Sequence, residues 1–396
     1  MALENKEEQS GSGAFLKDVL ICSLGAYGGP EAHFGVFTDQ LVTKKKYLNE
    51  EELIELIALC SILPGPTSTQ TIVAIGHKRG GPWLGFLTML VWALPILLLM
   101  TMLSFVYFFL ETLNLSGDGL RYIGPMAVGF IVVAAWKIGT KVATDRLTIT
   151  LLLFGALVTY AIRAPWIFPL VLVIGGAVSI FFSGQTNLWN TTKVNPPWKY
   201  LAAFGLLALS GIAGAILSDN RLIQLFESFY RYGYLVFGGG QVVVPVMYGE
   251  LVILREYLTS QQFLTGFGLV QGLPGPMFSF AAFAGGLAVS DHGILLQIAG
   301  AMLSGISIFL PGLLLIFFIY PVWEDIKKIK AIKISLRGIN AIAGGMITAA
   351  AVLLMQNSGM QIDNIIVMLL TTVILFSKKV PAPLIVVIVL IAGFLF

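Results

Sequence analysis

The chain has 396 residues, a formal net charge of +3, 57% hydrophobic residues and only 11% charged residues. An ordinary soluble domain carries about 25% charged residues, so the composition argues against a soluble enzyme or a basic nucleic-acid-binding domain and predicts an integral membrane protein. Two cysteines without a close pair argue against a disulfide framework, and three dispersed histidines argue against a metal centre.

The apolar runs predict an all-α protein that crosses the membrane many times. Residues 1–14 carry glutamates before any apolar run, unlike a cleaved signal peptide, and we expect a cytoplasmic tail there. A helix needs ~20 residues to cross the hydrocarbon core, and on that basis we expect about thirteen spanning or partly spanning segments. In chain order they are 18–37, 53–76, 83–110, 122–136, 147–162, 165–182, 200–218, 226–248, 262–288, 294–320, 337–355, 363–376 and 380–396.

The second half of the chain repeats the first at an offset of 210 residues. The tetrapeptide Leu-Pro-Gly-Pro at 63–66 returns at 273–276, and residues 27–76 share 14 identities in 50 with residues 237–286. Unrelated segments of average composition would share roughly 3 or 4. We therefore predict a first repeat over 15–182, a linker and connecting helix over 183–218, and a second repeat over 219–396.

Charge placement predicts that the two repeats are inverted. With a cytoplasmic N-terminus and thirteen crossings, 17 of the 24 Lys and Arg residues fall inside and 7 outside, in agreement with the positive-inside rule. The run Lys44–Lys46 is the exception, and a first segment that re-enters instead of crossing would explain it. The connecting helix 200–218 makes the second repeat enter from the opposite side, which is the usual basis of alternating access.

The two Pro-Gly-Pro motifs are candidates for a binding site. Pro64 and Pro66 lack N–H donors and push the preceding residues away from helical geometry, so segment 53–76 should break and a half-helix should restart at Pro66. The free N–H groups and positive dipole end of a half-helix attract an anion, and the Thr-Ser-Thr-Gln run at 67–70 adds donors. In the second copy only Ser279 keeps a hydroxyl. The alternative is a kink that serves helix packing alone.

A glycine motif precedes each Pro-Gly-Pro motif. The motif at 28–30 and its counterpart at 238–240 predict unwound backbone that lines a cavity, with close helix packing as the alternative. Ionisable groups beside them are candidates because burial of charge in a membrane is costly. His33 could titrate near neutral pH beside an anion, or it could be a neutral packing residue bonded to Glu31 or to backbone.

The sequence thus predicts a substrate site and no catalytic centre. Walker A, hydrolase-elbow and zinc-protease motifs do not occur in the sequence, and we expect no enzyme activity, no cofactor and no metal. The candidate substrate-binding residues are Gly28, Gly29, Pro30, Glu31, His33, Pro64, Gly65, Pro66, Thr67, Ser68, Thr69, Gln70, Gly238, Gly239, Gly240, Gln241, Pro274, Gly275, Pro276 and Ser279.

In the order of these motifs the chain resembles a bidomain, long-chain member of the chromate ion transporter family. The resemblance covers both halves and implies export of chromate from the cytoplasm through the plasma membrane, which is the inner membrane in bacteria, and hence chromate resistance. Export would be driven by the membrane potential or by ion exchange. The matching residues are Gly28, Gly29, Pro30, His33, Gln70, Gly76, Gly80 and Gly81 with the first Leu-Pro-Gly-Pro, and Phe237, Gly238, Gly239, Gly240, Pro245 and Glu250 with the second.

We expect a secondary transporter that holds chromate, or a similar divalent oxyanion, between the two Pro-Gly-Pro half-helices. Its partners would be the oxyanion and the lipid bilayer, with no nucleic acid, and the chain could form a homodimer. Sulfate, with nearly the same shape and charge, is the alternative substrate. A membrane enzyme acting on a lipid phosphate, or an uncoupled channel, stays open from sequence.

Overall fold

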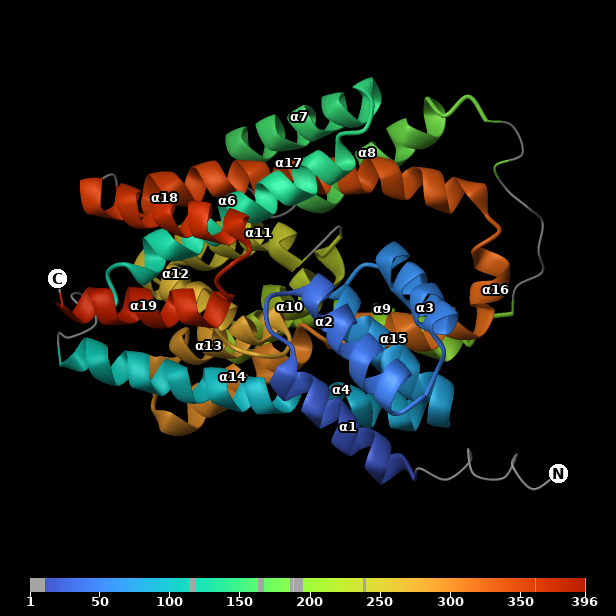
Figure 1. Ribbon diagram of the computed structural model, residues 1–396, viewed down its shortest axis with the longest axis horizontal. Coiled ribbons are helices and arrows are strands. Elements are labelled where there is room, and N and C mark those ends of the chain that lie inside the picture. Colours follow the sequence, from blue (N-terminus) through green and yellow to red (C-terminus); the bar gives the residue numbers. More distant parts are fainter. Residues whose placement is uncertain are drawn as a thin grey trace.

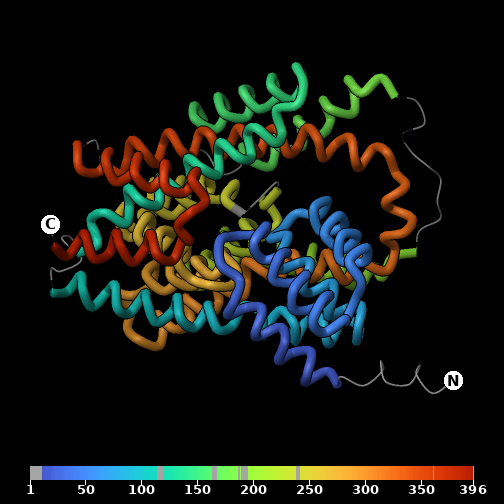
Figure 2. The backbone as a smooth tube through the Cα atoms, viewed as in Figure 1, coloured from blue at the N-terminus to red at the C-terminus, as the bar shows by residue number. Residues whose placement is uncertain are grey.

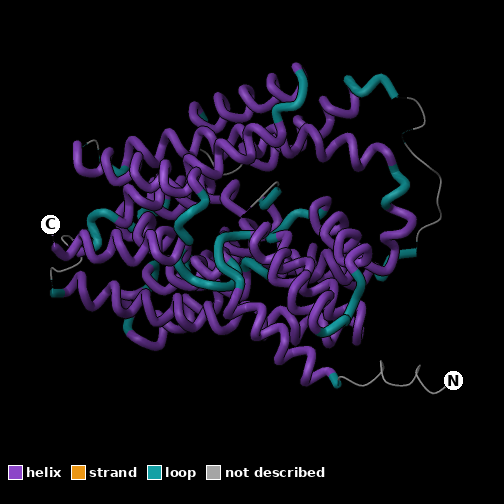
Figure 3. Tube along the Cα trace, viewed as in Figure 1, coloured by secondary structure: helices purple, strands orange, loops and turns teal. Residues whose placement is uncertain are grey.

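The protein is helical throughout the part of the chain that the structure describes. The structure is a computed structural model, and it describes residues 11–113, 119–162, 167–185, 188, 195–237, 240–359 and 361–395. Many of the helices run along the long axis of the molecule (Figure 1), and the described segments form helices and loops but no strand (Figure 3). The predicted all-α membrane fold is confirmed.

The first half begins with short helices and continues with long ones. The capping box between Asn49 and Glu52, in which each side chain bonds the backbone N–H of the other residue, starts α3. In chain order the elements are α1 Ser12–Gly25, α2 Pro30–Phe37, the π-helical turn η1 Thr38–Lys44, α3 Glu50–Ile62, α4 Thr67–Thr112, α6 Ile123–Val142, α7 Arg146–Ala161, α8 Ile167–Phe181 and the connecting helix α9 Trp198–Leu217.

The second half repeats this order of elements. They are α10 Arg221–Leu235, the 3-10 turn η2 Gly240–Val243, α11 Val244–Tyr248, the π-helical turn η3 Gly249–Leu254, α12 Ser260–Gln271, η4 Met277–Ser279, α13 Phe280–Leu287, η5 Ser290–His292, α14 Ile294–Ser307, α15 Leu310–Ile319, η6 Tyr320–Val322, α16 Trp323–Ile326, α17 Lys330–Asn357, α18 Ile362–Ser377 and α19 Ala382–Leu395.

Backbone details also recur at the offset of 210 residues. Lys46 and Glu256 are both non-glycine residues with positive φ, 53° and 51°. The capping box that starts α3 recurs at Thr259 and Gln262, where it starts α12. The π-helical turns η1 and η3 occupy corresponding positions as well. The sequence repeat is therefore a structural repeat in these segments.

α1 and the α2–η1 segment form the two arms of a hairpin. Gly28 and Gly29 have φ of 90° and 91°, which glycine adopts without steric cost, and the chain reverses there. Beyond η1 the chain is back beside the start of α1. There the hydroxyl of Tyr47 donates to Asp18 at 2.6 Å, and the Tyr47 ring packs edge-on against Phe15.

α3 and the first part of α4 form a second hairpin around residues 63–66. Its base is closed by an ion pair between Lys78 and Glu52. The α3 arm has 13 residues, about 20 Å at 1.5 Å per residue, which is too short to cross a ~30 Å hydrocarbon core. The guanidinium of Arg79 lies 4.3 Å from the Tyr47 ring centroid, so both hairpins have their bases at one end of the molecule. We call this the first end.

The run Lys44–Lys46 also lies at the first end, because Lys45 is 3.5 Å from the carboxylate of Asp18. Segment 18–37 therefore belongs to a hairpin that returns to its starting end, instead of one helix that runs from end to end. The run and Arg79 share that end of the molecule, which is the arrangement expected if the first segment re-enters.

The second half contains two corresponding hairpins. The arms of one are α10 and the η2–η3 segment, and the arms of the other are α12 and the η4–α13 segment. At their bases the hydroxyl of Tyr257 donates to Gln224, and the guanidinium of Arg221 lies 4.7 Å from the Tyr257 ring centroid. Arg221 also donates to the carbonyl of Ala288, just beyond α13. We call this the second end.

The first end and the second end of the molecule are joined by the part of α4 that follows residue 81. This helix folds back at residues 80–81, where a Cβ on Gly76 would lie 2.2 Å from Oγ1 of Thr88, a contact that a straight helix cannot make. The chain then runs helically to Glu111, which accepts a hydrogen bond from Gln262 at the base of α12. Thirty residues span about 45 Å, close to the thickness of a bilayer with its headgroups.

Five helical stretches of the described residues are long and apolar enough to cross a membrane: Thr67–Thr112, Ile123–Val142, Trp198–Leu217, Ile294–Ile326 and Lys330–Asn357. The first of them contains the reversal at residues 80–81, so its crossing part is the stretch after that reversal. The four hairpins return to their starting ends, and the count of about thirteen spanning or partly spanning segments stays a prediction.

The long helices of the two halves interlock through small residues. α17 of the second half packs against α7 and α8 of the first, while α6 of the first packs against α18 of the second (Figure 1). At the α8–α17 contact a Cβ on Gly338 would lie 2.0 Å from the carbonyl oxygen of Gly175. Close backbone approach at small residues is typical of helix packing in membranes.

Gly338→Ala should therefore destabilise the protein by about 1–3 kcal/mol, because the new methyl group must push α17 away from α8. Gly139→Ala is the control, since its nearest neighbour would be a leucine methyl at 3.9 Å. Thermal unfolding of the detergent-purified variants measures the difference. Equal melting temperatures for the two variants would contradict this description of the interface.

Candidate functional site

The tips of the hairpins meet between the two ends, and each half bonds to the other there. The N–H of Gly65 donates to the carbonyl of Val236 at 2.8 Å, and the N–H of Gly275 donates to the carbonyl of Ala26 at 2.7 Å. The two bonds are related by the offset of 210 residues. Each Pro-Gly-Pro loop thus contacts the residue two positions before the glycine motif of the opposite half. In Figure 2 the blue segments of the first half lie against the yellow and orange segments of the second half.

The first Pro-Gly-Pro loop ends at an uncapped helix N-terminus. α3 ends at Ile62 and α4 begins at Thr67, so the predicted break and restart are confirmed. The N–H of Gln70 already bonds the carbonyl of Pro66, and no side chain caps α4. The three preceding N–H groups, those of residues 67–69, lack intrahelical acceptors and carry the positive end of the helix dipole.

The hydroxyl side chains behind this terminus are buried and connected to His33. Nδ1 of His33 lies 2.9 Å from the hydroxyl of Ser68, and the indole N–H of Trp92 donates to the hydroxyl of Thr69. His33 is 2% exposed, and its Nε2 has no partner among the described residues. When Ser68 donates to Nδ1, the ring proton lies on Nε2 and is free to donate to a ligand.

Gln70 holds the loop in place. Its amide nitrogen donates to the carbonyl of Pro64 at 2.8 Å, and the amide lies over Gly65, where a Cβ would come within 2.6 Å of it. Gly65 has φ of 129° and Gly275 has φ of 78°, so both loops use a conformation that favours glycine. One of the two amide hydrogens of Gln70 therefore closes the loop, and only the other remains to donate to an oxyanion.

The second Pro-Gly-Pro loop leads into a short 3-10 turn, η4, before α13 begins. Ser279 is completely buried, and its hydroxyl has no partner among the described residues. Gly275 lies against Ile96 of α4 and against the backbone of Ser23. The second tip therefore offers one free hydroxyl in apolar surroundings, in agreement with the plainer sequence Met277-Phe278-Ser279.

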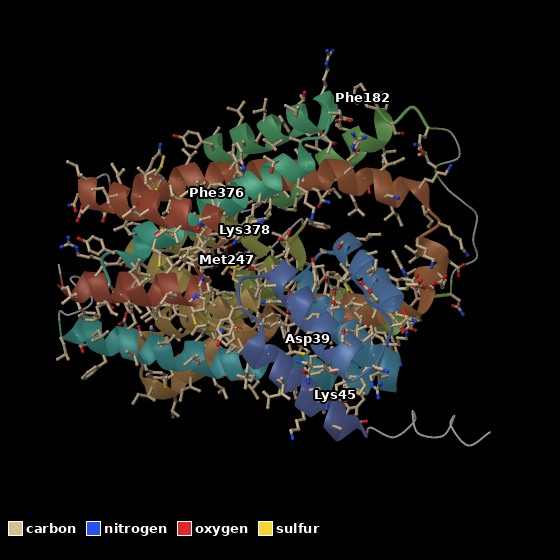
Figure 4. All side chains as sticks on the ribbon, in the orientation of Figure 1. Asp39, Lys45, Phe182, Met247, Phe376 and Lys378 are labelled. Atoms are coloured by element: carbon tan, nitrogen blue, oxygen red, sulfur yellow. The ribbon has the colours of Figure 1, made fainter. Side chains whose placement is uncertain are left out.

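The other polar candidates beside the glycine motifs differ in their exposure and in their partners. Glu31 is exposed, and no hydrogen bond from His33 to Glu31 is present, since the imidazole bonds Ser68 instead. Asp39 is exposed and pairs with Lys44, and Figure 4 shows it on the first-half hairpin near Lys45. Gln241 is half-buried in η2.

The remaining candidates belong to the loops themselves. Pro30 begins α2, Gly240 begins η2, and Pro274 and Pro276 flank Gly275. The predicted residues Gly238 and Gly239 lie outside the described residues.

Sequence reasoning missed a buried polar cluster behind each glycine hairpin. In the first half Asp18, which is 2% exposed, accepts from Gln40 and Tyr47. The corresponding second-half residues Ser228, Glu250 and Tyr257 include one carboxylate as well, but at the position of Gln40 and not of Asp18. Each of these two clusters thus contains one buried acid, and comparison of polar positions at the offset of 210 could have revealed the pair of clusters.

Helices broken at matching points of two repeats, with their tips bonded to each other between the two ends of the molecule, are typical of secondary transporters. The fold and the site define a multi-pass membrane protein of this class.

Comparison with known proteins agrees. The sequence model of the chromate transporter family matches residues 14–180 and 223–395, and the chain belongs to this family. It is 27% identical to the chromate transport protein of Cupriavidus metallidurans, over 85% of this chain and 80% of that protein. It is also 27% identical to the chromate transport protein of Pseudomonas aeruginosa, over 84% and 78%, and 24% identical to an uncharacterised transporter of Methanocaldococcus jannaschii, over 88% and 86%. No solved structure matches the chain.

Proposed function

We propose that this protein is a secondary transporter that carries chromate out of the cytoplasm across the plasma membrane, with its N-terminus on the cytoplasmic side. The observation that carries the proposal is the pair of bonds between opposite halves, Gly65 to Val236 and Gly275 to Ala26. They bring together the loops at which helices of both repeats begin, and helix N-termini bind anions through free N–H groups and the helix dipole.

The donors near the first tip suit a tetrahedral oxyanion. The N–H groups of residues 67–69, the hydroxyl hydrogen of Thr69, which accepts from Trp92, and Nε2–H of His33 are donors without a required internal acceptor. Ser279 supplies a hydroxyl from the other half. An oxyanion held between the two tips would interact with both repeats at once, so its binding depends on how the repeats are placed.

The arrangement of the hairpins supports alternating access. The first-half hairpins have their bases at the first end and the second-half hairpins have theirs at the second end. We propose that these ends face opposite sides of the membrane, with the first end in the cytoplasm. The repeats are then inverted, and exchange of their conformations would open the tips to one side or the other.

The direction of transport follows from the charge of the substrate. A membrane potential of ~100 mV, negative inside, favours the exit of a divalent anion by ~4–5 kcal/mol, at ~2.3 kcal/mol per charge. Export of chromate therefore needs no second ion, and exchange for another ion would add to this driving force.

The test is uptake of radiolabelled chromate into inverted membrane vesicles, with and without an interior-positive potential, and with sulfate as competitor. We expect accumulation that rises with the potential and that sulfate inhibits. Vesicles that hold folded protein and show no chromate flux above vesicles without the protein would overturn the proposal.

Ser68→Ala should raise the KM for chromate about fivefold to tenfold, because it removes the hydrogen bond that orients His33 and keeps the ring proton on Nε2. Thr348→Val is the control. It too removes a hydroxyl, but that hydroxyl bonds only the carbonyl of Gly344 in its own helix, α17. The vesicle assay measures both. An unchanged KM for Ser68→Ala would exclude this hydroxyl from the site.

A further inference from the structure

The second half holds a buried network of two arginines and two glutamates. Arg231 on α10 donates from Nε and Nη2 to Glu227, one helical turn earlier, at 2.6 and 3.0 Å. Its Nη2 also donates to both oxygens of Glu250 at 2.9 Å. Arg255 donates from Nε to Glu250 at 2.9 Å. Glu250 is 1% exposed and Glu227 is 7% exposed, so these charges are removed from solvent.

Arg231 keeps one nitrogen free. Nη1 is buried and has no partner among the described residues, while the other two nitrogens of the guanidinium are fully engaged. Its side chain is 17% exposed, the least of the cations in the ion pairs of the described residues. A buried guanidinium N–H without an acceptor is unusual, because the loss of its hydration is not compensated.

The position of Arg231 places this free donor near the hairpin tips. α10 starts at the second end and finishes at Leu235, and the next residue, Val236, accepts the bond from Gly65. Arg231 is five residues before Val236, about 7 Å along a helix. It therefore lies between the tip contact and the second end, on the side by which an exported anion would leave.

The first half has no counterpart to this residue. At the offset of 210 residues, Arg231 corresponds to Ile21 and Glu227 corresponds to Lys17. The cation that pairs with the buried Asp18 is Lys45, whose side chain is 47% exposed at the first end. The repeat accounts for one buried carboxylate with a cation beside it in each half, Asp18 with Lys45 and Glu250 with Arg255, but it leaves Arg231 and Glu227 without a counterpart.

We propose that Arg231 is a second contact for the transported oxyanion, between the hairpin tips and the second end. Nη1 donates to an oxygen of a tetrahedral divalent oxyanion, and Glu227 and Glu250 fix the guanidinium so that this one nitrogen faces the anion. The proposal rests on the proposed transport function and adds a residue to it. Because the network holds two arginines and two glutamates and is neutral as a whole, Arg231 contributes a directed hydrogen bond without an excess positive charge that would trap the anion, which suits a site that an anion must leave.

The test uses Arg231→Lys and Arg231→Gln in the chromate vesicle assay, with protein amounts measured in the membrane. Loss of the Nη1 donor should raise the KM for chromate about tenfold or more in both variants, since the lysine ammonium cannot reproduce the fork geometry of arginine. Arg121→Gln is the matched control, because Arg121 forms an exposed ion pair with Asp363 and should leave the KM unchanged. The double variant Glu227→Gln with Arg231→Gln removes one stranded carboxylate, and it keeps the test valid if the single variant folds poorly.

A second readout does not depend on chromate flux: the shift of melting temperature of purified protein with added chromate or sulfate. We expect a clear shift for the wild type and a reduced one for both Arg231 variants. Wild-type KM and wild-type shifts in both variants would show that Arg231 only pairs its two glutamates, and would overturn the inference. Wild-type protein that sulfate stabilises through Arg231, but that moves no chromate, would overturn the proposed substrate and retain this contact. Absence of any shift and any flux in the wild type would overturn both.

Discussion

Gly275→Ala and Gly65→Ala should each reduce chromate transport about a hundredfold while the protein remains in the membrane. Both glycines have positive φ and donate the bonds that join the two halves. A Cβ on Gly275 would lie 2.8 Å from Ile96, and one on Gly65 would lie 2.6 Å from the amide of Gln70. Backbone strain of up to about 3 kcal/mol, together with the clash, should displace the loop and the helix start behind it.

The control for this pair is Gly184→Ala. Gly184 also has positive φ, 61°, but it lies in the linker and an added Cβ would meet nothing within 4 Å. It carries the backbone strain without the contact between halves, and transport should stay within about twofold of wild type. If Gly275→Ala transports as well as Gly184→Ala, the contact between the tips has no role in transport.

Glu250→Ala should destabilise the protein by about 3–5 kcal/mol, the largest stability effect that we expect of a single substitution. The carboxylate is 1% exposed and accepts hydrogen bonds from Arg231, Arg255 and Ser228. Its removal leaves two buried or half-buried guanidinium groups with fewer acceptors, and an uncompensated buried charge is costly.

The comparison for Glu250 is Glu324→Ala. Glu324 pairs with Lys327, but its side chain is 70% exposed, and exposed ion pairs contribute about 0–1 kcal/mol. Chemical or thermal unfolding in detergent should show a large loss for the first variant and almost none for the second. Similar melting temperatures would mean that the network around Arg231 is not a buried one.

The helix breaks and the repeat were predictable from sequence because they depend on local chemistry. Pro64 and Pro66 cannot continue a helix wherever they occur, and the identity between residues 27–76 and 237–286 reports duplication directly. The helical class follows from the long apolar runs. These predictions needed no knowledge of which segments are neighbours in space.

The re-entry of the hairpins could not be derived in the same way. Segment 53–76 has the length of a crossing helix, and hydropathy is the same for an arm that returns and one that continues. The ion pair between Lys78 and Glu52 decides it, and that contact joins residues 26 positions apart. The run Lys44–Lys46 was the one sequence signal of a returning segment.

The polar partners of the site also depend on tertiary packing. His33 is bonded to Ser68 and not to Glu31, because α2 packs against the start of α4 and leaves Glu31 exposed. Glu250 was named from sequence, but Asp18 was not, because its counterpart at the offset of 210 residues is Ser228 and the counterpart of Glu250 is Gln40. Simple identity counts across the repeat do not register such an exchange.

The central claim is that the hairpins of the two halves enter the membrane from opposite sides and meet at their tips. Lys46→Cys and Glu256→Cys test it directly, since the two positions correspond at the offset of 210 residues and both are exposed. The native Cys22 and Cys60 are buried, and the wild type gives the background labelling. With a membrane-impermeant maleimide we expect the Lys46→Cys variant to react only in inverted vesicles and the Glu256→Cys variant only in intact spheroplasts. Labelling of both variants from the same side would contradict the account.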